Sequence, residues 1–195
     1  TSGTTITKSV NSQPFDAITI NSNLNNVKIE NCNFRGAFSN TIVLNSGVRN
    51  AVIQNNIIDG YPSSPTTVGI KENSNAYNDT FLGNTIKNIG YAIFTEGFNS
   101  TIANNTLHSN KGGVLVGTDP SNIDPSTPNA ICDQYQNYCS IPGNGKDISI
   151  NNNQITNNLY GITTFGLDNK IINNTIYSTT TFTNYREGIR VESIF

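Results

Sequence analysis

Three carboxylates in the chain recur at nearly equal intervals, a spacing that could bring them together for catalysis. Glu72, Glu96 and Asp119 lie 24 and 23 residues apart, and Lys71 directly precedes the first of them. Paired carboxylates hydrolyse glycosidic bonds, and a carboxylate base beside a cation suits a lyase or an epimerase. If the chain is an enzyme, we expect these four residues to converge in one groove and to act on a polysaccharide. The alternative is that they are solvated charges on a sheet face.

The single histidine and the three cysteines give little reason to expect a metal site or a cofactor. His108 follows Leu107 at an expected turn, away from the acids, and is predicted to be a surface side chain rather than a general base. Cys132 and Cys139 lie in a segment rich in turn formers, which favours a disulfide and an oxidising compartment over two free thiols in a cytosolic loop. Cys32 is expected to remain a buried free thiol.

The composition argues for a secreted protein and against two classes of partner. Charged residues make up 12%, the net charge is -2, and the 11 Lys and Arg form no basic stripe that would bind nucleic acid. No apolar run approaches the roughly 20 residues of a membrane helix, and the start resembles a processed, mature product. Secretion also agrees with four glycosylation sequons, although a chain rich in Asn and Thr contains some by chance: Asn78, Asn99, Asn104 and Asn173.

These residues are carried by an internal repeat, which is the strongest pattern in the chain. Its six-residue unit has apolar first and sixth positions around an Asn-rich middle, and it occurs at Ile29–Phe34, Ile53–Ile58, Phe81–Ile86, Ile102–Leu107, Ile150–Ile155 and Ile171–Ile176. A second unit, a small residue followed by an apolar one, comes about 12 residues later, as at Ala92-Ile93 and Gly161-Ile162. One repeat of about 21 to 24 residues fits a solenoid coil of three short strands. Ile6 and Ile18 add a degenerate first coil, which makes about seven.

The fourth position of the six-residue unit is almost always Asn and should form a row along the solenoid. A bend there would require left-handed backbone, which Asn tolerates best after Gly. Stacked amides can also hydrogen-bond to one another from coil to coil. We expect a buried Asn ladder, with Cys32 taking the place of Asn in the first of these units: Asn56, Asn84, Asn105, Asn153 and Asn174.

The two units together resemble the right-handed parallel β-helix repeats of the pectate-lyase-like superfamily and of NosD-type surface proteins. The resemblance covers about residues 5 to 192 apart from insertions, and it implies one all-β domain over 1–195 with an inserted loop at about 118–146. It also implies that the small-apolar unit is the first sheet, and that the Asn pair marks the turn between the second and third. The catalytic motifs of polygalacturonases (Asp-Asp, Gly-His-Gly) and of pectate lyases (Arg-x-Pro-x-x-Arg) are absent.

The first sheet is the face on which the enzymes of this superfamily bind polysaccharide. Its outward row is predicted to be Thr19, Val43, Lys71, Phe94, Leu115, Thr163 and Arg190. Insertions at 60–66, 178–184 and 118–146 should flank this face, and loops often carry function.

Strand-like sequence at both ends, with no capping helix, predicts self-association into an oligomer or a fibre. We therefore expect a non-enzymatic extracellular structural or adhesive module, such as a filament or surface-layer subunit. The alternative is a carbohydrate-active enzyme or a carbohydrate-binding fibre domain that uses the first sheet.

Overall fold

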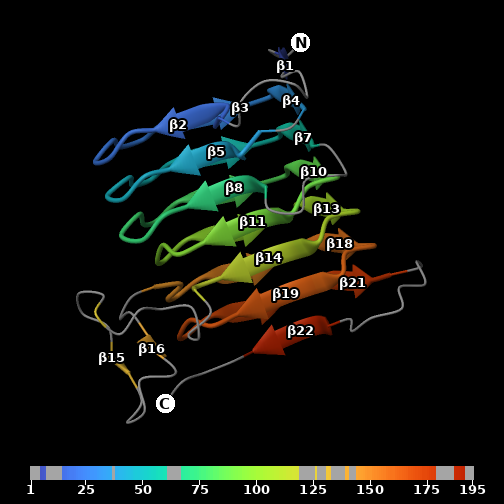
Figure 1. The fold of residues 1–195 in the computed structure, drawn as a ribbon. Coiled ribbons are helices and arrows are strands. Elements are labelled where there is room, and N and C mark those ends of the chain that lie inside the picture. The colour runs from blue at the N-terminus through green and yellow to red at the C-terminus, as the bar shows by residue number, and fades with distance from the viewer. Residues whose placement is uncertain are drawn as a thin grey trace.

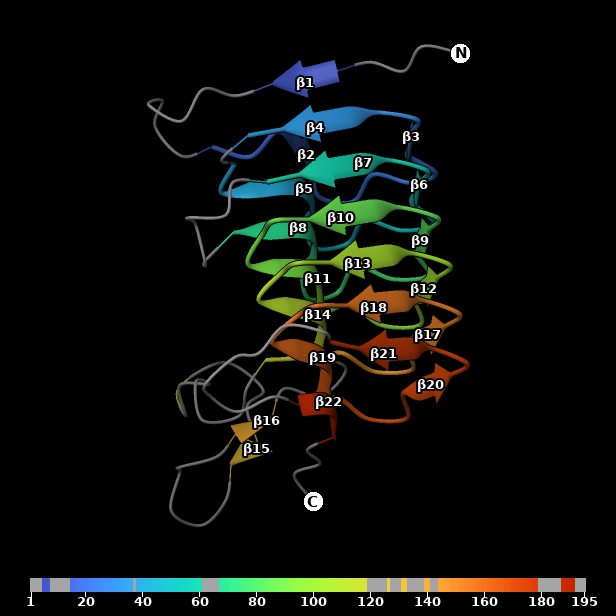
Figure 2. The same cartoon turned by 90° about the vertical axis from the view of Figure 1, so that its right-hand side faces the viewer.

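The computed structural model is a parallel β-solenoid in which each coil contributes one strand to each of three sheets (Figures 1 and 2). The structure describes residues 5–7, 15–36, 38–60, 67–118, 126, 131–132, 139–140, 144–178 and 187–191. Apart from one short hairpin, each strand pairs in parallel with the equivalent strand of the next coil. The predicted right-handed parallel β-helix is confirmed. The described residues contain no helix that is long and apolar enough to cross a membrane.

The strands of each sheet follow one another along the solenoid axis. Sheet 1 consists of β2 (Ile18–Ile20), β5 (Asn40–Leu44), β8 (Val68–Glu72), β11 (Tyr91–Thr95), β14 (Gly112–Val116), β19 (Tyr160–Thr164) and β22 (Glu187–Val191). Sheet 2 consists of β3 (Lys28–Glu30), β6 (Val52–Gln54), β9 (Thr80–Leu82), β12 (Thr101–Ala103), β17 (Ser149–Asn151) and β20 (Lys170–Ile172). Sheet 3 consists of β1 (Thr5–Thr7), β4 (Asn33–Arg35), β7 (Ile57–Asp59), β10 (Thr85–Lys87), β13 (Thr106–His108), β18 (Gln154–Thr156) and β21 (Thr175–Tyr177).

The predicted anchor row forms the core of sheet 2. The first positions of the repeat are register partners in successive strands, and all but the last are buried: Ile29, Ile53, Phe81, Ile102, Ile150 and Ile171. The sixth positions form the matching row in sheet 3. β-branched residues suit such rows because their branched side chains pack well on a pleated surface.

The first coil differs from the prediction. Ile6 was expected to be a first-position anchor, but in β1 it pairs with Phe34, which occupies the sixth position of the next unit. The described part of sheet 2 therefore starts at β3, and the solenoid has six coils with strands in all three sheets. Ile6 and Ile18 are 12 residues apart, as in the other repeats, but Ile6 belongs to the row of sixth positions and not to the row of first positions.

The Asn ladder is confirmed between sheets 2 and 3. Each ladder side chain accepts a hydrogen bond from the backbone N–H of its equivalent in the preceding coil, and, where that equivalent is Asn, a second one from its side-chain amide. Each also donates to a backbone carbonyl. For Asn105, Oδ1 accepts from Asn84 N at 2.8 Å and from Asn84 Nδ2 at 3.0 Å, and Nδ2 donates to Phe81 O at 2.9 Å. Asn110 and Asn158 make a second, shorter ladder between sheets 3 and 1.

The left-handed backbone lies one residue before the ladder and not in it. At the turn from sheet 2 to sheet 3 the positive φ angles belong to Asn31, Asn55, Gly83, Asn104, Asn152 and Asn173. Thirteen of the sixteen described non-glycine residues with positive φ are Asn, because its short polar side chain tolerates this region. The high Asn content therefore serves two distinct positions, a buried ladder and exposed turns.

The insertions predicted from the coil lengths lie mostly outside the described residues, but the strands that they connect are described. The segments at 60–66 and 178–184 each connect a strand of sheet 3 to one of sheet 1, and the long insertion connects β14 of sheet 1 to β17 of sheet 2. Within the long insertion, β15 (Ile131–Cys132) and β16 (Cys139–Ser140) form an antiparallel pair.

Candidate functional site

The outward row of sheet 1 is the one predicted from the sequence. Its members are register partners from coil to coil: Thr19, Val43, Lys71, Phe94, Leu115, Thr163 and Arg190. Apolar and hydroxyl side chains occupy the middle of the row, and a cation stands on either side of them. This row forms the floor of the site.

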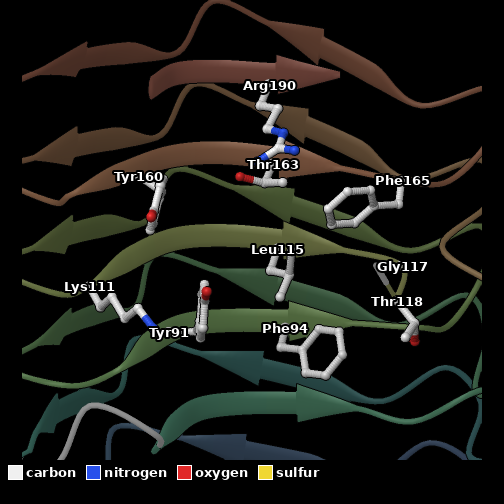
Figure 3. A pocket seen from close by; sticks show the side chains of 10 residues that line it. All are labelled: Tyr91, Phe94, Lys111, Leu115, Gly117, Thr118, Tyr160, Thr163, Phe165 and Arg190. Atoms are coloured by element: carbon white, nitrogen blue, oxygen red, sulfur yellow. The ribbon is translucent and has the colours of Figure 1, made fainter. Parts of the chain in front are cut away.

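A groove of about 360 Å³ opens on this face above β11, β14 and β19 (Figure 3). In Figure 3, Tyr91, Lys111 and Tyr160 lie on one side of this row and Phe165 lies on the other, with Phe94 and Leu115 in the row between them. The described residues that line it are Tyr91, Phe94, Lys111, Leu115, Gly117, Thr118, Tyr160, Thr163, Phe165 and Arg190. An open, shallow site with aromatic walls suits an extended ligand.

Gly112 creates the space beside the two tyrosines. It is the register partner of both Tyr91 and Tyr160, and therefore lies between them along the axis. A Cβ atom at Gly112 would lie 2.4 Å from Cδ1 of Tyr91, too close for any side chain unless the ring moved. The two tyrosine rings are therefore two coils apart along the axis, and Gly112 leaves the space between them open.

The cations of the groove lie over aromatic rings. Lys111 Nζ is 5.6 Å from the centroid of the Tyr91 ring, and the Arg190 guanidinium carbon is 6.0 Å from that of Phe165. Arg190 Nη1 also lies 3.7 Å from Glu187 Oε2. The described lining contains no carboxylate, and Glu187, which pairs with Arg190, lies outside it.

The structure does not bring the four candidate catalytic residues together. Glu72 is fully buried inside the solenoid, whereas Lys71 points outward and lies 5.8 Å from the Phe94 ring centroid. Glu96 is half-buried and directly follows β11, and it accepts a hydrogen bond from the Thr118 hydroxyl. Asp119 lies outside the described residues.

The expectation that Glu72 shares a groove with Lys71 is therefore wrong. Successive side chains of a strand point to opposite faces, so the inward Ile70 and outward Lys71 make Glu72 inward again. Its register partners are Leu44 and Thr95, both fully buried. The alternation was a signal in the sequence that places Glu72 in the core.

Sequence analysis did not identify Tyr91, Lys111 and Tyr160 as site residues. A signal for the tyrosines was present, because each directly precedes the small-apolar unit of its coil, in Tyr91-Ala92-Ile93 and Tyr160-Gly161-Ile162. Their meeting on one wall of a groove depends on Gly112 in the intervening coil.

His108 is the last residue of β13, on the outer face of sheet 3. The prediction that it lies on a turn is therefore wrong. It pairs in register with Lys87, and its Nδ1 lies 3.4 Å from Ser109 Oγ. Partial burial and the nearby Lys87 lower the pKa of His108 below its usual value. The groove and the acids belong to other faces of the solenoid, so His108 has no role there.

The cysteines fall in two environments. Cys32 is a free thiol, as predicted, but it is half-buried rather than buried, and it donates to Glu30 O at 3.3 Å. Cys132 and Cys139 are opposite each other in the β15–β16 pair. Directly opposed residues of antiparallel strands have Cα separations that a disulfide can span. Their side chains lie outside the described residues, and the disulfide stays a prediction.

The four sequon asparagines are exposed residues of turns, all with positive φ. Asn78 and Asn99 lie where sheet 1 leads to sheet 2, and Asn104 and Asn173 lie where sheet 2 leads to sheet 3. Asn99 Nδ2 donates to Asn78 Oδ1 at 3.3 Å. Glycans at these positions would extend from the corners of the solenoid, and their attachment stays a prediction.

The fold and this face define the chain as a right-handed parallel β-helix with an open groove on its first sheet. Residues 1–127 match the family model described as the right handed beta helix region, so the chain belongs to that family. No curated protein matches the chain in sequence.

Proposed function

We propose that this chain is a non-enzymatic, extracellular adhesive module that binds a carbohydrate chain in the groove of sheet 1. The groove supports this function best because aromatic rings form both of its walls. The apolar faces of sugar rings pack against aromatic faces, and a shallow open groove accommodates a polymer that continues beyond the site. The buried Glu72, and the lack of a carboxylate in the described lining, favour binding over catalysis.

The charges of the groove favour an acidic polysaccharide. Lys111 and Arg190 supply positive charge to the described lining, and the Glu187 carboxylate that pairs with Arg190 lies outside the lining. A uronate carboxylate can accept hydrogen bonds from an ammonium or a guanidinium group, and such charge-assisted bonds are stronger than neutral ones. A neutral glycan would use the rings alone and should bind less tightly.

Binding is tested by calorimetry with polygalacturonate and alginate as acidic probes and dextran as a neutral probe. We expect the acidic chains to bind more tightly, with an affinity that falls as salt is added. Tyr91→Ala should weaken binding about tenfold, since loss of one aromatic anchor removes more than about 1 kcal/mol. Tyr177→Ala is the matched control, because Tyr177 is half-exposed on sheet 3, and it should bind like the unaltered protein.

Two outcomes would contradict this function. Equal binding by the Tyr91→Ala and Tyr177→Ala proteins would place the ligand outside the groove. Release of shorter oligosaccharides during incubation, abolished by Glu96→Gln, would show that the chain is an enzyme.

A structural role through self-association is favoured by a second observation, at the coil formed by β20, β21 and β22. Ile189 occupies an inward row, with Ile162 as its register partner, yet it is 52% exposed. Val191 is 65% exposed and Ile172 is 49% exposed. No further described strand pairs with the outer edges of β20, β21 and β22, and apolar surface beside such edges is the kind of surface on which another β-structure adds.

If this coil mediates assembly, light scattering should show a particle mass that rises with protein concentration. Ile189→Glu should keep the particle at 21.1 kDa, because a charged side chain is not tolerated in a buried contact. Thr19→Glu, which alters an exposed residue of the outward row of sheet 1, tests whether the effect is specific to this coil. A strictly monomeric protein at high concentration would remove the filament role and leave carbohydrate binding.

A further inference from the structure

The interior of the solenoid contains a carboxyl group that the proposed binding function does not use. Glu72 is 0% exposed, in a row whose neighbours on either side are Leu44 and Thr95. Its Oε1 accepts from Ser100 Oγ at 2.7 Å, and its Oε2 accepts from the Thr95 hydroxyl. A Cβ atom at Gly97 would lie 2.4 Å from Glu72 Cδ, so glycine leaves the space that the carboxyl occupies.

A second buried acid lies beside Glu72, at the corner where sheet 1 leads to sheet 2. Asp79 is 1% exposed, and its Oδ1 accepts from Ala51 N at 2.6 Å. Its Oδ2 is buried and accepts no hydrogen bond from a described side chain or backbone group. Ser100 links the two acids, because its Oγ accepts from Asp79 N at 3.1 Å and donates to Glu72 Oε1 at 2.7 Å. Two ionised carboxylates in this position would repel each other, whereas a proton between them satisfies both.

We infer that the folded protein holds one proton between Glu72 and Asp79, and that this proton makes the solenoid a pH-sensitive fold that is most stable in mildly acidic solution. The shared proton joins two residues of one coil across the corner of the core. Its loss in alkaline solution leaves two negative charges inside the solenoid. The coils from β5 to β12, which contribute the surrounding residues, should loosen first.

The groups that face the pair provide no cation to compensate for the two acids. The preceding coil presents Leu44 and Ala51, and the following coil presents the hydroxyls of Thr95 and Ser100. The charged residues next to Glu72 and Gly97 in the chain do not face the pair, since Lys71 lies over the Phe94 ring and Glu96 accepts from Thr118. Asp79 is the charged group that acts on Glu72.

The direction of the pH dependence follows from these surroundings. Burial, and then the charge of Asp79, raise the pKa of Glu72 well above its ordinary value of 4.5. Burial raises the pKa of Asp79 from 3.8 to about 6, although the bonds from Ala51 and Glu72 oppose the rise. At a pH between the ordinary and the raised pKa values, the folded state therefore binds more protons than the unfolded state. Stability is greatest at the low end of this range and falls as the pH rises through the folded-state values.

The test is thermal unfolding of the full chain, followed by circular dichroism between about pH 5 and about pH 8.5. We expect Tm to fall by several degrees over this range. Glu72→Gln should flatten the profile, because its amide donates to Asp79 Oδ2 at every pH. Glu96→Gln, the same change in a half-buried acid one coil away, should keep the original slope.

A slope that is unchanged in Glu72→Gln would overturn the inference. If that variant does not fold, infrared spectroscopy of the unaltered protein decides instead, since a protonated carboxyl has its own C=O stretch. This band should persist at neutral pH and disappear in alkaline solution, and its absence at neutral pH would also overturn the inference. So would stabilisation by calcium at alkaline pH, because a cation rather than a proton would then join the two acids.

Discussion

Replacement of Asn105 by leucine is expected to lower the free energy of unfolding by about 3 to 5 kcal/mol. The substitution leaves Asn84 N–H, one amide N–H of Asn84 and the Phe81 carbonyl without their partner inside the solenoid. Each buried polar group left unpaired costs about 1 to 3 kcal/mol. Urea unfolding followed by circular dichroism measures the change.

Asn104 is the matched control for this substitution. It is the neighbouring residue, but it is exposed and has a φ of 54°, which glycine adopts freely. Asn104→Gly should therefore change stability by less than about 0.5 kcal/mol. If both variants unfold at the same urea concentration as the unaltered protein, the ladder contributes no stability.

The second large effect is expected at Phe81, the aromatic member of the anchor row. Phe81 is fully buried between Ile53 and Ile102 of the adjacent coils. Phe81→Ala should lower the free energy of unfolding by about 3 to 5 kcal/mol, since it removes apolar contacts and leaves a cavity. Guanidinium unfolding at fixed pH gives the value.

Phe81→Ile separates the loss of volume from the loss of the ring. Isoleucine is the residue found at the other positions of this row, so the variant should retain more than half of the stability that Phe81→Ala loses. Equal losses in the two variants would mean that the ring itself, and not the filling of the row, stabilises this coil.

The architecture was predictable because a solenoid repeats one local solution. The apolar anchors and the Asn-rich middle recur at fixed intervals, and each coil packs chiefly on its two neighbours. The register of the anchor row and the members of the ladder followed from that spacing. Ile6 was assigned to the wrong row, because a single apolar residue at the right distance can belong to either of two rows.

The site was less predictable because it depends on relations between coils. The outward row of sheet 1 followed from alternation, but the groove also requires Gly112 beside Tyr91 and Tyr160, and each of them comes from a different coil. Glu72 and Lys71 are adjacent in the chain and were predicted to act together, yet they lie on opposite sides of the same sheet.

The β-helix, the ladder and the outward face of the first sheet could be predicted from the sequence, because they follow from periodic burial and from the hydrogen-bonding capacity of Asn. The groove shared by the aromatic rings and two cations, and the buried pair of Glu72 and Asp79, became evident from the three-dimensional arrangement of the coils. Such contacts depend on how far each side chain reaches across neighbouring coils, and on which small residue leaves the space for it. A repeat pattern specifies the position of the backbone at each coil, but the packing of the individual side chains decides what the surface and the interior can bind.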